Sequence, residues 1–301
     1  YIVFQVLGLN LINENGVSCF IVPNTTLRSV IHKNFRKHAL DKSNIIEIVD
    51  LKANAFIGVT TSPVIILKNN KTNPKNKIKI IDTNFRKHKN VELSDIHYIK
   101  QDNLKTNPFY VFNIFSKDKD LEIISKIRKE KTYIKNLSKF IIEGIVAKNE
   151  LIHDRKVNNK CRKFIRGGDV KRYRVEYNNE YIEYDRDRIH RARPDELWRA
   201  RKKIFIQRIS GGKKPLVCSV DENKYLSFAS TNVLLLLEEF EKNYSYEVIC
   251  TLLNSKLINY FYSKTFSNGS ELTVNISTSY LEEIPIPKKN SHTSKIFNEI
   301  N

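Results

Sequence analysis

The segment TNPFYVFNIF, residues 106–115, contains the tetrapeptide Asn107-Pro108-Phe109-Tyr110, whose residue types could do chemistry. Proline fixes the backbone, so an asparagine followed by two prolines presents its side-chain amide and a neighbouring carbonyl in a set geometry. Such a pair of groups can hold an amino group for reaction. Phe109 stands where the second proline would be needed, and this relaxes the geometry. We therefore assign no catalytic role to Asn107.

The stretch Asp50-Leu51-Lys52 is a second candidate, because an acid two residues before a lysine is part of some nuclease centres. The sequence supplies no second acid at a suitable spacing, so we predict the end of a strand instead. The seven histidines do not fall at metal-ligand spacing, and no G-x-S-x-G, H-E-x-x-H or P-loop motif occurs. A glycine-rich cofactor loop is also absent from the sequence. We therefore predict no catalytic residue and no metal site in these 301 residues.

Basic residues dominate the charge balance, with a formal net charge of +19. Between Arg155 and Lys214 there are 20 Lys and Arg against 8 Asp and Glu, and aromatic residues are interleaved with them. Such a surface suits a phosphate backbone, because each neutralised phosphate releases counterions. A lysine-rich proteome would also make a protein basic. Arginine outnumbers lysine in this block, however, and it is the better bidentate ligand of phosphate, so we predict a nucleic-acid partner.

The basic block contains two Gly-Gly pairs, in FIRGGDVKRY and RISGGKK, and a series of alternating arginines from Arg186 to Arg193. Gly-Gly permits a close approach to phosphate, although a turn between strands explains either pair without a ligand. On a strand the alternating arginines would share one face, and on a loop they would fan along a backbone. The predicted nucleic-acid contacts are Arg166, Lys171, Arg172, Arg174, Arg186, Arg188, Arg191, Arg193, Arg208, Lys213 and Lys214.

The elements that must position these residues follow from hydrophobic patterning. Residues 1–12 indicate an amphipathic helix, residues 24–40 a second helix with Leu27, Ile31 and Phe35 on one face, and 17–23 and 44–51 two strands. The stretches 62–68 and 77–82 predict a closely spaced strand pair joined by a polar hairpin loop. The alternation of strand, helix and strand predicts one edge of an α/β sheet in residues 1–105.

The pattern of predicted elements changes after this first domain. Residues 106–136 predict a connector that includes a charged helix. Residues 137–301 contain short strands and turns, together with one long helix over 244–266, and predict a β-rich α+β second domain.

Several blocks resemble, in their order, adenine-specific DNA methyltransferases of restriction–modification systems, in the TaqI-like gamma class. NENGVSCFIVPNTTLR and IIEIVDLKANAFIGVTTSPVIILK are similar to the segments that follow the catalytic motif of that family. KFIRGGDVKRY, RARPDELWRARKKIFIQRIS, CTLLNSKLINYFYSKT and LEEIPIP are similar to its C-terminal target-recognition domain. The resemblance covers nearly the whole chain and implies the edge of a Rossmann-like methyltransferase sheet followed by a domain that binds double-stranded DNA.

The resemblance also implies chemistry that lies mainly outside this chain. The family uses S-adenosylmethionine, and its cofactor glycine motif and NPPY motif would precede Tyr1. Asn107 comes too late in the chain to be that NPPY motif. Such enzymes turn the target adenine out of the duplex and stack it on an aromatic ring. Phe56 matches the position of the stacking phenylalanine, although a loop aromatic that anchors a hairpin would have the same spacing.

The resemblance implies a site-specific DNA adenine-N6 methyltransferase, and a restriction endonuclease could be its partner or be fused to it. A non-enzymatic DNA specificity subunit remains an alternative, because such subunits use domains that resemble residues 137–288. A general basic nucleic-acid-binding protein is a third hypothesis. Four scattered cysteines, no signal peptide and no membrane-length apolar run favour a cytoplasmic protein. A chain without methionine that begins inside a helical pattern is expected to be a C-terminal fragment, inactive by itself.

Overall fold

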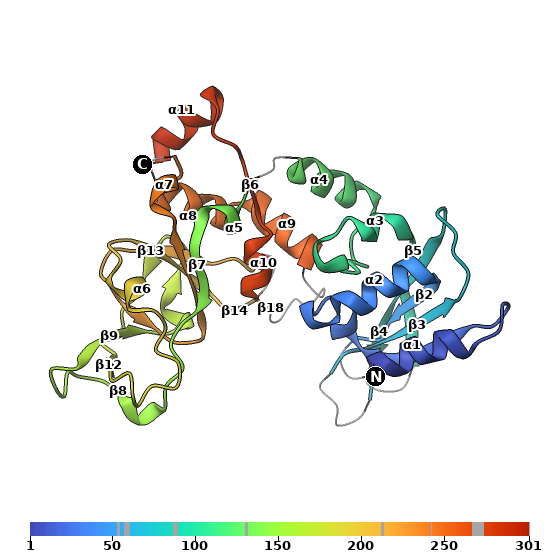
Figure 1. Ribbon diagram of the computed structural model, residues 1–301, viewed down its shortest axis with the longest axis horizontal. Helices are drawn as coiled ribbons and strands as arrows, with labels where there is room; N and C mark the ends of the chain where they lie inside the picture. The colour runs from blue at the N-terminus through green and yellow to red at the C-terminus, as the bar shows by residue number, and fades with distance from the viewer. Residues whose placement is uncertain are drawn as a thin grey trace. The chain divides into compact units, whose positions relative to one another are not determined.

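In the computed structural model the chain forms two compact units (Figure 1). The first comprises Tyr1–Ser125 and a short stretch that begins at Lys264, and the second comprises most of the chain from Lys126 onward. The structure describes residues 1–52, 55–56, 61–86, 90–129, 132–211, 214–241, 243–266 and 274–300. None of the described helices is long and apolar enough to cross a membrane.

The first unit is built on one five-stranded sheet. Its elements are α1 (Ile2–Leu11), β1 (Ser18–Pro23), α2 (Lys33–Lys42), β2 (Asn44–Asp50), β3 (Pro63–Asn69), β4 (Lys77–Arg86), β5 (Asn90–Lys100) and α3 (Gln101–Lys105). The strand order is β1-β3-β2-β4-β5. Strand β3 is antiparallel to both β1 and β2, so β1 and β2 run parallel to each other and are connected through α2. Strands β2 and β4 are parallel, whereas β4 and β5 are antiparallel.

The predicted hairpin between residues 62–68 and 77–82 is wrong. Strand β2 lies between β3 and β4, so the polar loop passes over the start of β2 instead of closing a hairpin. Side chains hold the loop there: Asn44 Oδ1 accepts a hydrogen bond from the Asn73 N–H at 2.7 Å, and Asn76 Nδ2 donates to the Ile45 carbonyl at 2.8 Å. A short sequence separation therefore did not mean direct pairing.

The helix predicted over residues 24–40 is shorter than expected. Two 3₁₀ turns, Asn24–Leu27 and Val30–His32, precede α2, and Ser29 between them is extended with φ −53° and ψ 133°. Leu27 and Phe35 are buried as predicted, but Ile31 is 82% exposed. The break at Ser29 rotates Ile31 away from the face that the uninterrupted helix would have given it.

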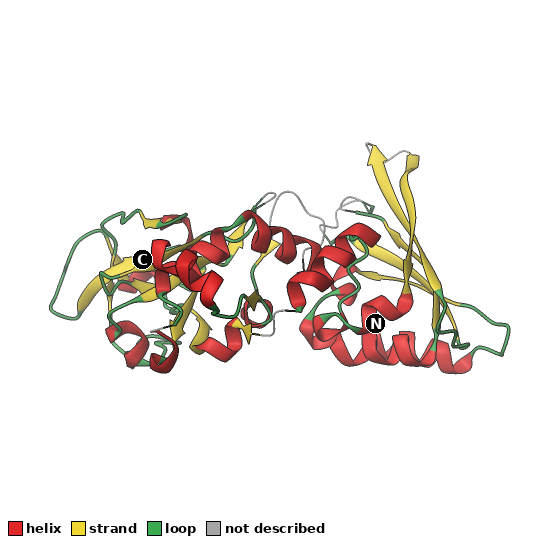
Figure 2. Ribbon diagram, turned by 90° about the horizontal axis from the view of Figure 1, so that it is seen from above, coloured by secondary structure: helices red, strands yellow, loops and turns green. Residues whose placement is uncertain are grey.

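The core of the first unit lies between the sheet and its helices (Figure 2). Alternate residues of the strands point into it, as the period of two in a strand requires. The core residues on β2, β3 and β4 are Ile45, Ile48, Val64, Ile66, Ile78 and Ile80. Phe112 and Ile114, from the segment predicted as a connector, are buried in the same core. Helix α4 (Asp118–Arg128) then leads from the first unit into the second.

The second unit contains many short strands. Its strands are β6 (Thr132–Tyr133), β7 (Ser138–Glu143), β8 (Ile152–His153), β9 (Cys161–Ile165), β10 (Val170–Lys171), β11 (Arg174–Val175), β12 (Tyr181–Glu183), β13 (Lys203–Gln207), β14 (Ile209–Ser210), β15 (Cys218–Asp221), β16 (Leu226–Ser227), β17 (Thr231–Leu236), β18 (Val274–Asn275) and β19 (Pro285–Ile286). Its helices are α5 (Ile134–Leu137), α6 (Asp195–Arg199), α7 (Glu238–Glu241), α8 (Tyr246–Asn254), α9 (Lys256–Phe266, whose last turn belongs to the first unit), α10 (Thr278–Glu282) and α11 (Ser291–Ile300).

Two four-stranded sheets organise this unit, in the orders β15-β13-β17-β7 and β16-β9-β12-β8. Strands β13 and β17 are central in the first sheet and almost entirely buried, with Phe205 and Trp198 among the largest core side chains. The long helix predicted over 244–266 is interrupted at Ser255, where α8 ends and α9 begins. The Ser255 hydroxyl accepts a hydrogen bond from the Ile258 N–H, as an N-cap does.

The chain is therefore a mixed α/β protein with several sheets, which agrees with the predicted class. Only part of the first sheet is parallel, namely β1 with β2 and β2 with β4.

Candidate nucleic-acid interface

The first Gly-Gly pair forms a turn that β9 and Ser230 hold in place. The Gly167 N–H donates to Ser230 Oγ at 2.8 Å, and a Cβ on Gly167 would lie 2.4 Å from the Ser230 carbonyl oxygen. Asp169 closes the turn by accepting the Arg166 N–H at 2.7 Å. Gly168 faces open space. Close packing therefore explains Gly167, and only Gly168 leaves its backbone accessible to a ligand.

Arg166 is oriented by two neighbours. Its Nε donates to both oxygens of Glu180, at 3.1 and 2.8 Å, and its guanidinium lies over the Phe228 ring at 5.6 Å. The side chain remains 38% exposed. A guanidinium fixed in this way keeps its outer nitrogens available to an anion at little further cost in conformational entropy.

Lys171 and Arg172 mainly bind protein carbonyls. Lys171 Nζ donates to the Gly168 carbonyl at 2.7 Å, and Arg172 Nη2 donates to the Lys214 carbonyl at 2.8 Å. Arg172 also donates to the carbonyl and side chain of Asn254. Arg172 therefore ties the second Gly-Gly segment to α8. Lys214 is exposed, and Lys213 lies outside the described residues.

Three further predicted arginines are exposed and paired within their own segments. Arg174 pairs with Glu176 at 2.6 Å, Arg186 with Asp195 at 2.5 Å and Arg188 with Glu183 at 3.1 Å. Such exposed pairs contribute little to stability and exchange readily for other anions. In the series from Arg186 to Arg193, Arg186 and Arg188 lie in a turn, Arg191 in an isolated bridge with Val146 and Arg193 in an irregular segment, so the series does not form one face of a strand.

The remaining predicted arginines converge on one carboxylate. Arg191, Arg193 and Arg208 approach Glu143, at the end of β7, with N–O distances of 3.9, 3.7 and 2.9 Å. Burial first, and then the neighbouring charges of Arg191 and Arg208, lower the pKa of Arg193. Sequence analysis missed Glu143, because its arginine neighbours lie about 50 or more residues away and no motif links them.

Phe56 lies in a bend and is 49% exposed, so it does not belong to the core. The chain reaches it from β2 through Lys52, whose φ is 58°. Lys52 Nζ bridges Asp50 at 2.8 Å and Asp82 at 2.7 Å and lies over the Phe115 ring at 4.5 Å. Although burial alone would lower it, the two carboxylates raise the pKa of Lys52. The predicted strand end therefore carries an ion-paired anchor, and β4 supplies the second acid that sequence spacing did not show.

Asn107 is a structural residue. It is buried, and its Nδ2 donates to the Val111 carbonyl at 2.7 Å and to Asn113 Oδ1 at 2.8 Å. Phe109 and Tyr110 both have positive φ, and their carbonyls accept hydrogen bonds from the buried Arg36. Since both amide hydrogens of Asn107 are used within the turn, this arrangement supports our decision to assign it no catalysis.

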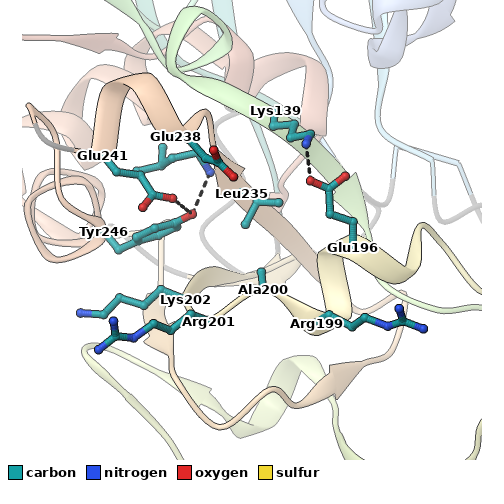
Figure 3. A pocket seen from close by; sticks show the side chains of 11 residues that line it. Lys139, Glu196, Arg199, Ala200, Arg201, Lys202, Leu235, Glu238, Glu241 and Tyr246 are labelled. Carbon is teal, nitrogen blue, oxygen red and sulfur yellow. Dashed lines mark hydrogen bonds and ion pairs between the residues drawn. The ribbon is translucent and has the colours of Figure 1, made fainter.

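A cavity of about 780 Å³ lies between α6, β17, α7 and α8 (Figure 3). Its charged lining residues are Lys139, Glu196, Arg199, Arg201, Lys202, Glu238 and Glu241. Tyr246 accepts the Leu236 N–H and donates to Glu241, and Lys139 pairs with Glu196. Burial raises the pKa of Tyr246. Acids and bases are mixed in this cavity, so it offers no surface of one charge for a nucleic acid.

Comparisons with known families agree with the order of these two units. Residues 1–56 match the family described as Eco57I restriction-modification methylase. Residues 162–286 match the family described as TaqI-like C-terminal specificity domain. The resemblance predicted from the sequence is confirmed: a methylase-like segment precedes a specificity-domain segment in one chain.

A curated relative supports the same assignment. A protein of Methanocaldococcus jannaschii, named as a type II restriction enzyme and methyltransferase, RM.MjaORFECS2P, is 24% identical over 270 residues. The alignment covers 87% of this chain and 22% of that protein. The chain thus spans about a fifth of the length of this relative.

Solved structures show a similar fold. The Type IIL restriction-modification enzyme MmeI, solved in complex with DNA, has a TM-score of 0.56 at 13% identity, covering 94% of this chain and 41% of that chain. A nuclease-deletion mutant of the Type ISP enzyme LlaGI, in complex with a DNA substrate mimic, has a TM-score of 0.54 at 12% identity, covering 96% and 29%. The DrdV–DNA complex has a TM-score of 0.52 at 11% identity, covering 92% and 37%.

Proposed function

We propose that this chain is the C-terminal part of a site-specific DNA adenine-N6 methyltransferase of a restriction–modification system. The observation that carries the proposal is the match of residues 1–56 to a methylase family and of 162–286 to a specificity-domain family in one chain. The methylase match also weighs against a specificity subunit without enzymatic activity, because such a subunit would not need residues 1–56. We further propose that the first sheet is the edge of a Rossmann-like methyltransferase sheet, in keeping with the parallel relation of β1 and β2.

The proposed division of roles follows the two units. The second unit would bind double-stranded DNA and select the site, because Arg166, Arg174 and Arg188 are exposed. Each of them forms an ion pair with a nearby glutamate that a phosphate could replace. Phe56 in the first unit would stack on the target adenine, since it is exposed and its segment is anchored by Lys52. Stacking on an aromatic ring is how base-modifying enzymes hold an extruded base.

S-adenosylmethionine would supply the methyl group in the whole protein. The sequence of the first unit does not fit this cofactor by itself, because its three glycines, Gly8, Gly16 and Gly58, are isolated from one another. The pair Gly167-Gly168 belongs to the second unit, where packing against Ser230 and the hydrogen bond from the Arg166 N–H to Asp169 explain its turn. We propose that the cofactor binds mainly to a part of the protein that precedes Tyr1.

Selection from a random duplex pool tests sequence recognition. The 301-residue chain would be incubated with the pool at about 50 and 200 mM salt, because phosphate contacts weaken strongly over that range. We expect enrichment of one short motif that contains adenine and persists at the higher salt. Binding that collapses with salt and enriches no motif would identify a general basic nucleic-acid-binding surface instead.

Methyl transfer tests the reaction. The full-length protein and labelled S-adenosylmethionine would be added to duplexes that carry the selected motif. We expect label in the adenine-containing duplex and none when that adenine is replaced by N6-methyladenine. Label in both duplexes, or in neither, would contradict the proposed adenine-N6 activity.

A further inference from the structure

More arginines gather around Glu143 than around the neighbouring glutamates Glu180 and Glu183. Glu180 and Glu183 each pair with one arginine, whereas Glu143 faces Arg191, Arg193 and Arg208. With three arginines and one glutamate, the group carries a formal net charge of +2. A single carboxylate cannot satisfy three forked guanidinium groups, which together offer many more donors than it has lone pairs.

The backbone holds the three arginines from separate segments. Arg193 Nε donates to the Gly144 carbonyl at 3.1 Å, and Arg208 Nη1 donates to the Ala229 carbonyl at 3.1 Å. Two backbone hydrogen bonds join Arg191 and Val146. Gly144 allows this assembly, because a Cβ there would lie 2.3 Å from the Phe228 carbonyl oxygen. The guanidinium groups of Arg193 and Arg208 are thus placed before any ligand binds, whereas for Arg191 the backbone alone is fixed.

Donor capacity remains after these contacts. The distances from Arg191 and Arg193 to Glu143, 3.9 and 3.7 Å, are too long for hydrogen bonds. Arg191 is 51% exposed and makes no side-chain hydrogen bond in the described part of the chain. A tetrahedral oxyanion has acceptors on several sides and suits such a group better than a planar carboxylate does.

We propose that Arg191, Arg193 and Arg208 form a phosphodiester-binding subsite in which Glu143 is a resident counter-anion that limits binding to DNA of any sequence. The proposal rests on the DNA-binding function proposed above. Glu143 repels an incoming phosphate, so backbone contacts alone give weak binding. Because that repulsion acts on DNA of any sequence, contacts to bases must supply the affinity that holds the protein at its recognition site.

Glu143→Gln tests the role of the carboxylate, because glutamine keeps the shape and removes the charge. We expect the affinity of the 301-residue chain for a motif-free duplex to rise about fivefold at low salt. Asp41→Asn is the matched control: it changes the net charge equally and removes an exposed carboxylate that pairs with Lys37 alone. We expect that control to change affinity less than twofold.

Arg191→Gln tests the subsite by removing one of its three positive charges. We expect the slope of log affinity against log salt to become shallower by about one, as for the loss of one phosphate contact. Lys37→Gln is its charge-matched control and should leave the slope unchanged. Fluorescence of Trp198, the only tryptophan and a buried residue of the second unit, verifies that this unit is folded in Glu143→Gln and Arg191→Gln.

The outcomes separate this inference from the proposed function. Equal effects of Glu143→Gln and Asp41→Asn, or a fall in affinity with Glu143→Gln in a folded protein, would overturn the role of Glu143. If Glu143→Gln does not fold, Arg191→Gln decides, and a slope equal to that of Lys37→Gln would overturn the subsite. If no motif is ever selected but the salt slope and the effect of Glu143→Gln are as expected, the phosphodiester subsite stands and site-specific methylation fails.

Discussion

Arginine has opposite environments in the two units. In the first unit Arg36 is fully buried and donates to the backbone carbonyls of Thr26, Arg28, Phe109 and Tyr110. In the second unit Arg166, Arg191 and Arg208 lie near the surface and face carboxylates. These hydrogen bonds tie α2 to the 26–28 and 109–110 segments, so the contact is structural. A carboxylate at the surface is itself solvated, so its arginines remain available to another anion.

Buried lysines differ between the units in the same way. Lys203 on β13 pairs with Asp221 on β15 at 2.5 Å, and neither side chain is exposed. Lys68 on β3 is equally buried, and within the described ranges its ammonium group contacts only the Gln5 carbonyl, at 3.1 Å, and the Phe35 ring, at 4.9 Å. In the second unit the charge of Lys203 is neutralised by Asp221. In the first unit the charge of Lys68 has no carboxylate beside it among the described residues, so its burial lowers stability. This contrast leads to four predictions, ordered by the size of the expected effect.

Asp221→Asn should have the largest effect on stability. Asparagine keeps one acceptor, for the Asn223 N–H, but its amide nitrogen cannot accept from the Tyr225 N–H, and the Lys203 charge is left uncompensated. We expect a loss of about 3–5 kcal/mol in the free energy of unfolding. Urea denaturation monitored through Trp198 measures it. Glu176→Gln, at the exposed pair with Arg174 in the same unit, is the control, and a loss below about 1 kcal/mol for Asp221→Asn would contradict a charged buried pair.

Arg36→Met should destabilise the first unit by about 3 kcal/mol. Methionine fills much of the volume but leaves the buried carbonyls of Phe109 and Tyr110 without this donor, and each such loss costs about 1–3 kcal/mol. Hydrogen exchange of the amides in β3 measures the change. Lys105→Met, at the exposed ion pair with Asp102 in the same unit, should change the free energy of unfolding by less than about 0.5 kcal/mol. Equal effects of the two substitutions would show that burial does not distinguish these two cationic side chains.

Lys68→Met should stabilise the first unit by about 2–3 kcal/mol at neutral pH, since burial lowers the pKa of Lys68 to about 8 from 10.5. Between these values the unfolded chain binds more protons than the folded chain. The free energy of unfolding of the unsubstituted protein should therefore rise as the pH increases from about 8 to 10.5.

The Lys68→Met variant should lack that rise. Hydrogen exchange of the β3 amides, corrected for the intrinsic effect of pH, compares the two proteins. A stability that depends on pH equally in both would show that Lys68 does not carry the cost of burial.

Phe56→Ala should affect activity more than stability. Because Phe56 is about half exposed, we expect its loss to change the free energy of unfolding by less than about 0.5 kcal/mol. Base stacking on an aromatic ring contributes about 1–3 kcal/mol, so methyl transfer by the full-length protein should fall about tenfold or more. Phe56→Tyr should retain most of the activity. If Phe56→Ala methylates normally, the stacking role proposed for Phe56 is wrong.

The sequence by itself determined the class of the fold, the basic character of the second unit and the family resemblance. These properties depend on local patterns: apolar alternation in β1, β2 and β3, the surplus of arginine between residues 155 and 214, and the order of family blocks. It also indicated that Asn107 is not catalytic, because a single residue, Phe109, breaks the required motif.

Only the tertiary structure decided which charges meet. The insertion of β2 between β3 and β4 brings Asp82 to Lys52, and the ends of β7 and β13 bring Arg208 to Glu143. Long-range pairing leaves no periodic signal in the chain, because a partner may lie at any sequence distance once strands assemble. For the same reason the sequence does not distinguish Lys68, Arg36 and Lys203 from charged residues at the surface. Only the fold shows that these three side chains are buried.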